Sequence, residues 1–474
     1  MPALDNAAIA AALHEYSALL ELAGAEPYAA RAFRRAAELV AATPLDGATL
    51  VRAGRGRELR EAAASGRLRE VPGIGAKTES SIRSALERPA PPRQAIRLDE
   101  ARGVVERIAA TLGGVVAGDV RRWRDQCEWL AVAVPTERPD ATRAQFAELH
   151  EIVAMIGPAV GVTVDGVAIE LHTSAPEVFG TTLVRATGSS GYLQALGELP
   201  DAPDEEGVFR LLGLPLVPPE LREVGAPPTP HGLVDTTDIR GDLHCHTTAS
   251  DGRSTLLEMA ESAIALGYEY LAICDHTKAV GVVQGLDADA VRRQGEEIAR
   301  ANEALAPFRI LRGIECDILP DGRLDLPDDV LGELDWVQLS LHAGQRAPRR
   351  ELTARVTHAM THPAVRCLSH PTGRLIGRRA ENALDLERTF EAALAADVAL
   401  EVNGLPARLD LSGEHVATAV AAGVSIVCST DAHSAAGLLN MPNSVHTARR
   451  GGAARSDVLN TLPLGALMAR IRVG

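Results

Sequence analysis

The sequence predicts a multidomain α/β protein, because its pattern of helix-like and strand-like segments changes twice along the chain. Two Pro-rich stretches, 88–95 and 217–232, separate an Ala- and Leu-rich helical segment from a mixed segment and then from a long C-terminal segment. This last segment alternates strand-like and helix-like runs seven times, which is typical of a parallel sheet or a (β/α) barrel. We therefore expect three domains, at 1–90, 96–225 and 238–474.

The composition of the chain excludes several classes of protein. Its 474 residues are 46% hydrophobic and 23% charged, and no apolar run reaches the ~18–20 residues of a membrane span. Its six cysteines are scattered without CxxC pairs, which argues against a disulfide scaffold and favours a reducing compartment. The start of the chain also lacks a basic region followed by an apolar core, so we expect a cytoplasmic protein without membrane contact.

Charge is distributed unevenly along the chain, whose net charge is −15. Residues 1–95 carry 13 basic and 11 acidic side chains, whereas residues 96–237 carry 11 basic and 21 acidic ones. Only the first segment is positive, and we expect any contact with the phosphates of nucleic acid to lie there.

The first segment is predicted to be helical, with helices over 5–22, 28–43 and 76–87. Before the last of these helices, VPGIGAKTESSI places Gly73 and Gly75 in a turn that can present backbone N–H groups to a phosphate. A turn that only packs two helices together is the alternative.

The hairpin and the Arg-rich helix before it resemble the small helix-hairpin-helix domain of family-X DNA polymerases. The resemblance implies contact with the DNA backbone that does not depend on sequence. The residues expected to make this contact are Gly73, Gly75, Lys77, Arg34 and Arg35.

The middle segment mixes secondary structures, with a helix predicted over 96–112 and strands over 130–134 and 167–172. It resembles the palm and thumb of family-X polymerases, which implies an α+β, nucleotidyltransferase-like fold. The stretches that carry this resemblance are VAGDVRRWRDQCEWLAVAV, VAIELHTSAPEVFGTTLVRATGSSGY and GLPLVPPELRE.

The carboxylates of a polymerase site are missing from this palm-like segment. Two-metal phosphoryl transfer needs carboxylates that hold both ions. Counted from Gly118, the first two acid positions fall on Trp129 and Ala131, and a one-residue slip would still supply only one acid. The third position is Glu170. We therefore expect polymerase activity to be lost.

Six of the seven strand-like runs in the C-terminal segment carry His or Glu at the last or next-to-last position. The C-terminal ends of the strands of a (β/α) barrel meet at one mouth, so these side chains should converge. Residues two apart on a strand, such as His244 and His246, point the same way. The runs are RGDLHCH, YLAICDH, ILRGIEC, DWVQLSLH, VRCLSH, VALEVNG and VSIVCSTDAH.

The converging side chains predict a metal centre. A single histidine at a strand end is most often a packing residue, but nine imidazoles and carboxylates in one place would be costly to desolvate without cations. This donor set, which contains no pair of thiolates, suits Zn²⁺, Mn²⁺ or Fe²⁺. The expected ligands are His244, His246, Asp251, His276, Glu315, His342, His370, Asp431 and His433.

The segment also resembles the PHP (polymerase and histidinol phosphatase) metal-dependent phosphoesterases. The motifs, in order, are GDLHCHTTASDG, ICDHT, GIECDIL, SLHAG, LSHPTGR, EVNG and STDAHS. The resemblance implies a distorted seven-stranded (β/α) barrel and two or three divalent metals, Mn²⁺ or Zn²⁺, with Fe²⁺ also possible. The implied ligand sets are His244, His246, Glu315 and Asp431; Glu315, His342 and His370; and Asp251, His276 and His433.

The resemblance assigns roles to particular residues. Glu315 bridges two of the metals, and its loss, like that of His246 or Asp431, is expected to abolish hydrolysis. Arg374, in HPTGR, is expected to grip a phosphate oxygen.

Three functions remain open at this point. The leading one is a metal-dependent phosphoesterase for DNA ends in repair, either a 3′→5′ exonuclease or a 3′-end phosphatase. The second is a phosphatase acting on a small phosphomonoester such as histidinol phosphate. The third, a non-enzymatic DNA-binding scaffold, does not explain a complete set of metal ligands. The expected partner is thus DNA, bound through residues 1–90, or a small phosphate ester.

Overall fold

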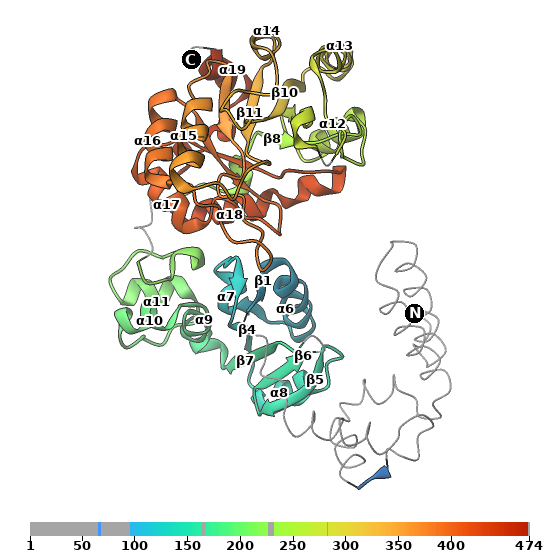
Figure 1. The fold of residues 1–474 in the computed structure, drawn as a ribbon. Coiled ribbons are helices and arrows are strands. Elements are labelled where there is room, and N and C mark those ends of the chain that lie inside the picture. The colour runs from blue at the N-terminus through green and yellow to red at the C-terminus, as the bar shows by residue number, and fades with distance from the viewer. Residues whose placement is uncertain (1–64, 68–94, 164–165, 226–231, 282, 473–474) are drawn as a thin grey trace.

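The structure is a computed structural model, and it describes residues 65–67, 95–163, 166–225, 232–281 and 283–472 (Figure 1). The three helices expected in the N-terminal segment lie outside these residues. So do the expected DNA contacts, which are Gly73, Gly75, Lys77, Arg34 and Arg35.

Residues 96–225, here called the middle segment, form a mixed five-stranded sheet with helices packed on it. The strand order is β2-β4-β7-β6-β5, and β4 and β7 run parallel. Helix α6 packs on this sheet because its buried residues, among them Val105 and Ile108, lie on one face. The expected helix and both expected strands are therefore confirmed.

The elements of the middle segment have the following bounds. The strands are β1 (Ile96–Arg97), β2 (Val115–Ala117), β3 (Gln126–Cys127), β4 (Leu130–Pro135), β5 (Ile152–Gly157), β6 (Val160–Thr163) and β7 (Ala168–Ser174). The helices are α6 (Leu98–Leu112), α7 (Gly118–Arg121), α8 (Pro139–Ala147), α9 (Phe179–Thr187), α10 (Ser190–Leu196) and α11 (Glu205–Leu211), with the short turn η3 (Pro219–Leu221).

The C-terminal segment forms a nearly closed barrel of seven parallel strands, which confirms the fold class expected from the alternating sequence pattern. The strands follow one another in chain order from β8 to β14, and a parallel bridge between Cys245 and Ala432 brings the two edge strands together. The strands are β8 (Gly241–Cys245), β9 (Tyr270–Ile273), β10 (Arg309–Asp317), β11 (Trp336–Ser340), β12 (Val365–Leu368), β13 (Ala399–Asn403) and β14 (Ile426–Ser429).

Helices surround this barrel (Figure 1). They are α12 (Leu256–Ala265), α13 (Ala288–Leu305), α14 (Asp328–Gly332), α15 (Arg349–Ala359), α16 (Leu386–Ala396), α17 (Gly413–Ala421), α18 (Met441–Arg450) and α19 (Leu464–Arg472). The strands are covered on both faces, which explains why they are continuous apolar runs in the sequence. Every residue of β8, β9, β11, β13 and β14 is buried, so the few polar residues in them must find partners inside the protein.

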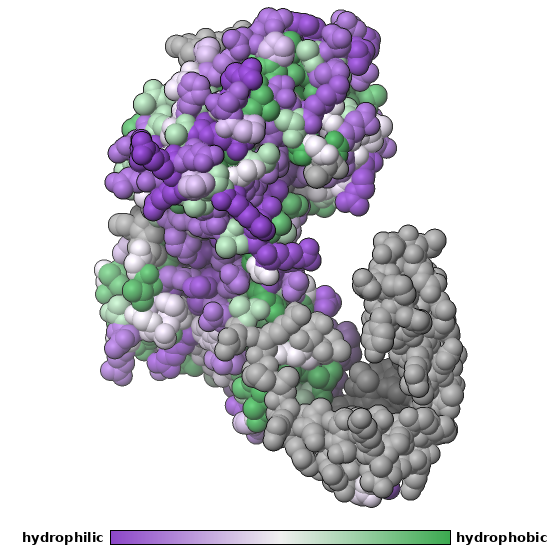
Figure 2. All heavy atoms as spheres, viewed as in Figure 1, coloured by the Kyte–Doolittle hydropathy of each residue, from purple (hydrophilic) through white to green (hydrophobic). Residues whose placement is uncertain are grey.

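The surface of the barrel is mostly hydrophilic in the view of Figure 2. None of the described helices combines the length and the apolar character needed to cross a membrane. All six cysteines are free and buried, and burial raises the pKa of the Cys316 thiol to about 12.

The barrel packs against the middle segment through α18 and the loops that follow β12 and β13 (Figure 1). The rings of Trp123 and His446 stack with their centroids 3.8 Å apart. Ile376 and Leu409 of the barrel are buried in the apolar core of the middle segment. Charged groups cross the same boundary, including a contact of 2.6 Å between Nε of Arg449 and Oε1 of Glu220.

Candidate metal centre

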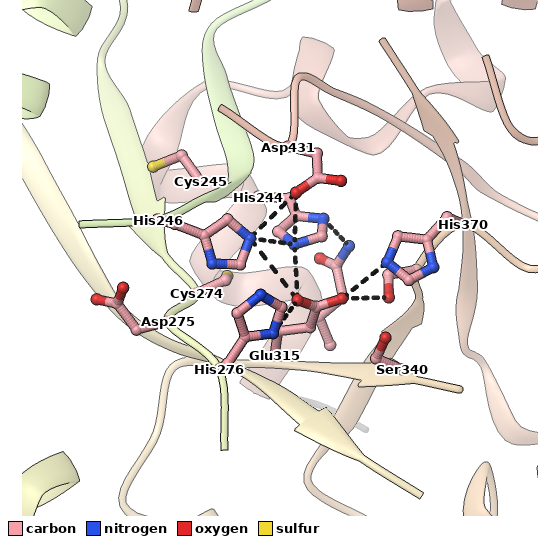
Figure 3. Close-up of polar contacts among 12 residues, drawn as sticks. His244, Cys245, His246, Cys274, Asp275, His276, Glu315, Ser340, His370 and Asp431 are labelled. Carbon is pink, nitrogen blue, oxygen red and sulfur yellow. Dashed lines mark hydrogen bonds and ion pairs between the residues drawn. The ribbon is translucent and has the colours of Figure 1, made fainter. Parts of the chain in front are cut away.

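The parallel strands bring all nine expected ligand side chains together at the C-terminal mouth of the barrel. Figure 3 labels some of them, namely His244, His246, His276, Glu315, His370 and Asp431. Each side chain comes from near the end of a strand or from the loop directly after it, and close contacts between imidazoles and carboxylates link all nine. This convergence follows from the topology, since parallel strands present their C-terminal ends at one edge.

Glu315, on β10, lies at the centre of the cluster. Its Oε1 is 2.9 Å from Nε2 of His370 and 3.6 Å from Nε2 of His342. Its Oε2 is 2.8 Å from Nδ1 of His276 and 3.6 Å from Nε2 of His244. One carboxylate thus faces imidazoles from four strands, as a group that bridges two cations would.

Two further carboxylates flank this centre. Oδ1 of Asp431 is 3.1 Å from Nε2 of His246. Oδ2 of Asp251 is 3.2 Å from Nε2 of His433 and 3.5 Å from Nε2 of His276. The cluster therefore alternates imidazoles and carboxylates across the mouth.

Mutual charge pairing sets the protonation of these groups. Burial alone would raise the pKa of Glu315, but the surrounding imidazoles hold it well below its ordinary value. Burial lowers the pKa of His276, but the charges and hydrogen bonds of Glu315 and Asp251 together outweigh this effect and raise that pKa to about 10. A ligating imidazole must be neutral, so a divalent cation that binds here competes with the proton on His276.

The donor set fits divalent metal ions. Nδ1 of His246, Nδ1 of His276 and Oε2 of Glu315 are buried without a hydrogen-bond partner among the described residues, an arrangement that cations would relieve. Three sets of ligand atoms lie within 4.8 Å of one another: His246, Asp251, His276 and His433; His244, His246 and Asp431; and His276, Glu315 and His342. Unlike the sets implied by the sequence resemblance, these place His246 and His276 in two groups each, whereas His370 meets the cluster through Glu315.

Two buried carboxylates orient the imidazoles, and sequence analysis missed both. Oε1 of Glu401, on β13, lies 2.6 Å from Nδ1 of His244, and its Oε2 accepts the backbone N–H of His370. Oδ2 of Asp317, at the end of β10, lies 3.1 Å from Nδ1 of His342. Such contacts fix the tautomer and the rotation of a metal-binding imidazole. The available signal was a carboxylate within an otherwise apolar strand.

The backbone near the centre is strained at two of the nine positions. His370 has φ +25° and Asp431 has φ +53°, a region that costs non-glycine residues about 1–2 kcal/mol. Each is held by a hydrogen bond from its own N–H, to Glu401 for His370 and to the carbonyl of His244 for Asp431. The surrounding contacts therefore fix the positions of both side chains despite this strain.

The loop that carries Asp251 is anchored by Asp275. The Asp275 carboxylate accepts the backbone N–H of Thr247 at 2.8 Å and the side-chain amide of Gln294 at 2.6 Å. A Cβ atom on Gly252 would lie 2.8 Å from the carbonyl oxygen of His246, so only glycine allows the loop to approach this closely.

The guanidinium of Arg374 makes contacts within the protein that the motif does not reveal. Nη1 donates to Oδ2 of Asp125 at 2.8 Å, Nε donates to the carbonyl of Arg408 at 2.9 Å, and Nη2 donates to the carbonyl of Leu409. Three of its five N–H groups thus hold neighbouring parts of the protein, and the expected contact of Arg374 with a phosphate oxygen stays a prediction.

Arg408, in the loop after β13, lies beside the cluster instead. Its Nε is 3.6 Å from Oδ2 of Asp431, and its Nε and Nη1 are buried without a hydrogen-bond partner. Burial and the charge of Arg408 lower the pKa of Arg379. A guanidinium with unused donors, such as that of Arg408, favours an anion.

In the middle segment, the positions expected for polymerase carboxylates lie on two neighbouring strands. Ala131 on β4 is paired in register with Glu170 on β7, and Glu170 is 3.2 Å from Nε2 of His172. The Asp119 carboxylate accepts the backbone N–H groups of Glu128 and Trp129, so it is used to hold the start of β4. Among the described residues, every cluster of possible metal ligands lies in the barrel.

Comparison with known proteins relates these features to two domain families. The model of the PHP domain matches residues 242–403, and that of a helix-hairpin-helix domain matches residues 4–88. The chain is 35% identical over 444 residues to the protein named "DNA polymerase/3′-5′ exonuclease PolX" of Bacillus subtilis (strain 168), across 86% of this chain and 78% of that protein.

The chain also matches shorter proteins over part of its length. A probable phosphatase of Acetivibrio thermocellus is 32% identical over 201 residues, which covers 40% of this chain and 78% of that protein. A solved histidinol phosphate phosphatase of Lactococcus lactis, in complex with zinc, L-histidinol and phosphate, aligns with 45% of this chain and 94% of its own, at 15% identity and a TM-score of 0.35. A TM-score this low supports no conclusion, so the family assignment depends on the sequence relatives.

Proposed function

Because this chain belongs to the family of the PolX DNA polymerase/3′-5′ exonuclease and is a metal-dependent phosphoesterase, we propose that it removes nucleotides from the 3′ ends of DNA. In this proposal residues 238–474 carry out hydrolysis, residues 1–90 contact DNA, and residues 96–225 are a polymerase-like fold without its activity. Contact with DNA through residues 1–90 is supported by the helix-hairpin-helix match.

One observation carries the proposal for hydrolysis. Nine imidazoles and carboxylates meet at one mouth, and three of their buried polar atoms lack any hydrogen-bond partner among the described residues. Burying such atoms away from water costs free energy unless cations bind to them. We assign all nine side chains to two or three divalent metals, with Mn²⁺ or Zn²⁺ the ions to test first.

The residues around the cluster have distinct roles in this proposal. A divalent cation in such a site stabilises the negative charge that develops on phosphoryl oxygens. Glu401 and Asp317 hold the imidazoles of His244 and His342 in the orientation required for ligation. In this proposal the unused donors of Arg408 bind a non-bridging phosphate oxygen, for which a guanidinium is well suited.

We also propose that the middle segment adds no nucleotides. Ala131 occupies the strand position opposite Glu170, and Glu170 itself is paired with His172. A single carboxylate cannot hold the two ions that nucleotidyl transfer requires.

A phosphatase acting on a small phosphomonoester is the second candidate. The likeness between the barrel and the probable phosphatases favours it. The two candidates differ in the bond that is hydrolysed. An exonuclease cleaves a phosphodiester between two nucleotides, whereas a phosphatase cleaves the phosphomonoester of a small molecule.

An assay on two substrates tests the proposal. Purified protein with Mn²⁺ should shorten a 5′-labelled single-stranded oligonucleotide one nucleotide at a time, and it should act far more slowly on histidinol phosphate. Asp431→Asn should lower the rate on DNA by roughly a thousandfold or more, since each ion contributes several kcal/mol. Asp321→Asn, an exposed carboxylate of the same barrel paired with Arg323, is the matched control and should not differ from the unaltered protein. Hydrolysis of histidinol phosphate without digestion of DNA would favour the second candidate instead.

A further inference from the structure

The contact between Asp125 and Arg374 connects the middle segment to the loop that carries Arg408. Asp125 lies in the turn before β3 of the middle segment, and Arg374 lies in the loop after β12 of the barrel. Both side chains are largely buried, with 17% and 12% of their surface exposed. Burial alone would raise the pKa of Asp125, but Arg374 and Arg450 hold it below its ordinary value, so the carboxylate is ionised.

The other donors of Arg374 hold the backbone of the loop after β13. Nε and Nη2 of Arg374 bind the carbonyls of Arg408 and Leu409, two consecutive residues of that loop. Leu409 has φ +44° and is buried in the apolar core of the middle segment. The middle segment thus fixes the backbone of this loop in two ways, through the ion pair of Asp125 with Arg374 and through the apolar contact of Leu409.

The opposite side of the same loop faces the metal cluster. Arg408 places Nε 3.6 Å from Oδ2 of Asp431, and Nδ2 of Asn403 donates to that same oxygen at 3.0 Å. A shift in the backbone at Arg408 and Leu409 would therefore move the guanidinium relative to Asp431.

We propose that Asp125 is a positioning residue for hydrolysis, which acts through Arg374 to hold the Arg408 guanidinium at the metal centre. The middle segment, although it lacks polymerase carboxylates, then has a direct role in the barrel's reaction. The inference rests on the proposed function of Arg408 and extends it to a second part of the chain. Binding of the phosphoryl group then depends on Asp125, a residue that lies far from the expected metal ligands in the sequence.

Binding of inorganic phosphate to the Mn²⁺-loaded full chain, measured by titration calorimetry, tests this inference without reference to turnover. Asp125→Asn keeps the size of the side chain but removes its charge, and it should weaken phosphate binding about tenfold, as expected when a charge-assisted contact is lost. KM for a small phosphomonoester should rise by a similar factor, and the number of metals bound per chain should not change. Asp140→Asn removes an exposed carboxylate that pairs with Arg143 within α8, and this control should leave phosphate binding unchanged.

Two further variants separate positioning from a general loss of structure. Arg374→Lys keeps the positive charge opposite Asp125 but cannot reach two carbonyls at once, so it should weaken phosphate binding as Asp125→Asn does. Asp125→Glu should restore part of the loss. In a chain that already carries Arg408→Gln, adding Asp125→Asn should cause no further loss, because both substitutions remove the same interaction.

The inference is overturned if Asp125→Asn binds phosphate as tightly as Asp140→Asn, or if its effect adds in full to that of Arg408→Gln. These outcomes are distinct from failure of the proposed function. A protein that digests DNA but shows no dependence on Asp125 contradicts the inference alone. A protein that does not digest DNA, yet needs Asp125 to bind phosphate, contradicts the proposed substrate and leaves the positioning role supported.

Discussion

Glu401 acts on the metal centre from inside the barrel, where it is fully buried. Its carboxylate contacts Nδ1 of His244, the side-chain amide of Gln338 and the backbone N–H of His370. Burial alone would raise the pKa of Glu401, but the charges of His244 and His370 and the contact with His244 together hold it below its ordinary value, so the group is ionised. An ionised carboxylate opposite Nδ1 leaves Nε2 of His244 as the atom that can donate a lone pair to a cation.

Glu401→Gln tests this role at a residue that touches no cation. The substitution keeps the size of the side chain but removes the charge that orients His244 and holds His370. Metal affinity, measured by competition with a chelator, should fall by about 10- to 100-fold, the usual effect of losing a carboxylate that orients a ligating imidazole. Glu333→Gln, which alters an exposed carboxylate paired with Arg292, should leave the affinity unchanged. Equal affinities in the two variants would show that Glu401 is only a packing residue.

At the scale of elements, α18 and η3 form much of the boundary between the barrel and the middle segment. Glu220 of η3 is buried and accepts contacts of 2.6 Å from Nε of Arg449 and 2.7 Å from Nδ1 of His446. Burial alone would raise the pKa of Glu220, but these two partners lower it from an ordinary 4.5 to about 2. The lowered pKa means that ionised Glu220 stabilises the folded chain.

The stability of the folded chain should therefore depend on pH through Glu220. Because the folded-state pKa lies below the unfolded one, this contribution is fully present above pH 4.5 and is lost as pH falls towards 2. It amounts to roughly 3 kcal/mol at neutral pH. Glu220→Gln should lower the free energy of unfolding, measured in urea, clearly at pH 7 and much less at pH 3. A difference that stays constant across this range, or one that also occurs in exposed Glu198→Gln, would contradict the assignment.

The barrel strands could be predicted from the sequence, whereas this boundary could not. Each parallel strand is buried on both faces, so it leaves a continuous apolar run such as YLAI in β9, and each run ends where a polar side chain reaches the mouth. The motif HPTGR, in contrast, does not reveal which group Arg374 contacts. Its partner in the structure, Asp125, lies 249 residues earlier in the chain. The burial of Glu401 inside a strand depends in the same way on contacts with residues that are distant in sequence.

At the scale of the whole molecule, the two described parts differ in the polar side chains that they bring together. The barrel gathers nine imidazoles and carboxylates that could hold metal ions, whereas in the middle segment Ala131 lies opposite Glu170 on the neighbouring strand. The contacts through Asp125, Glu220 and Trp123 join the two parts over a buried boundary. We therefore propose that the chain has one hydrolytic centre, in the barrel, which the polymerase-like part supports.

A single gel tests this central claim most directly. The full chain and its Asp431→Asn variant are each incubated with a 5′-labelled primer on a template, Mn²⁺ and all four deoxynucleoside triphosphates, and the products are separated under denaturing conditions. We predict that the unaltered chain shortens the primer and that Asp431→Asn leaves its length unchanged, because hydrolysis depends on the barrel and no carboxylate pair supports extension. A primer longer than the input in the Asp431→Asn lane, or shortening that persists in that lane, would contradict the account.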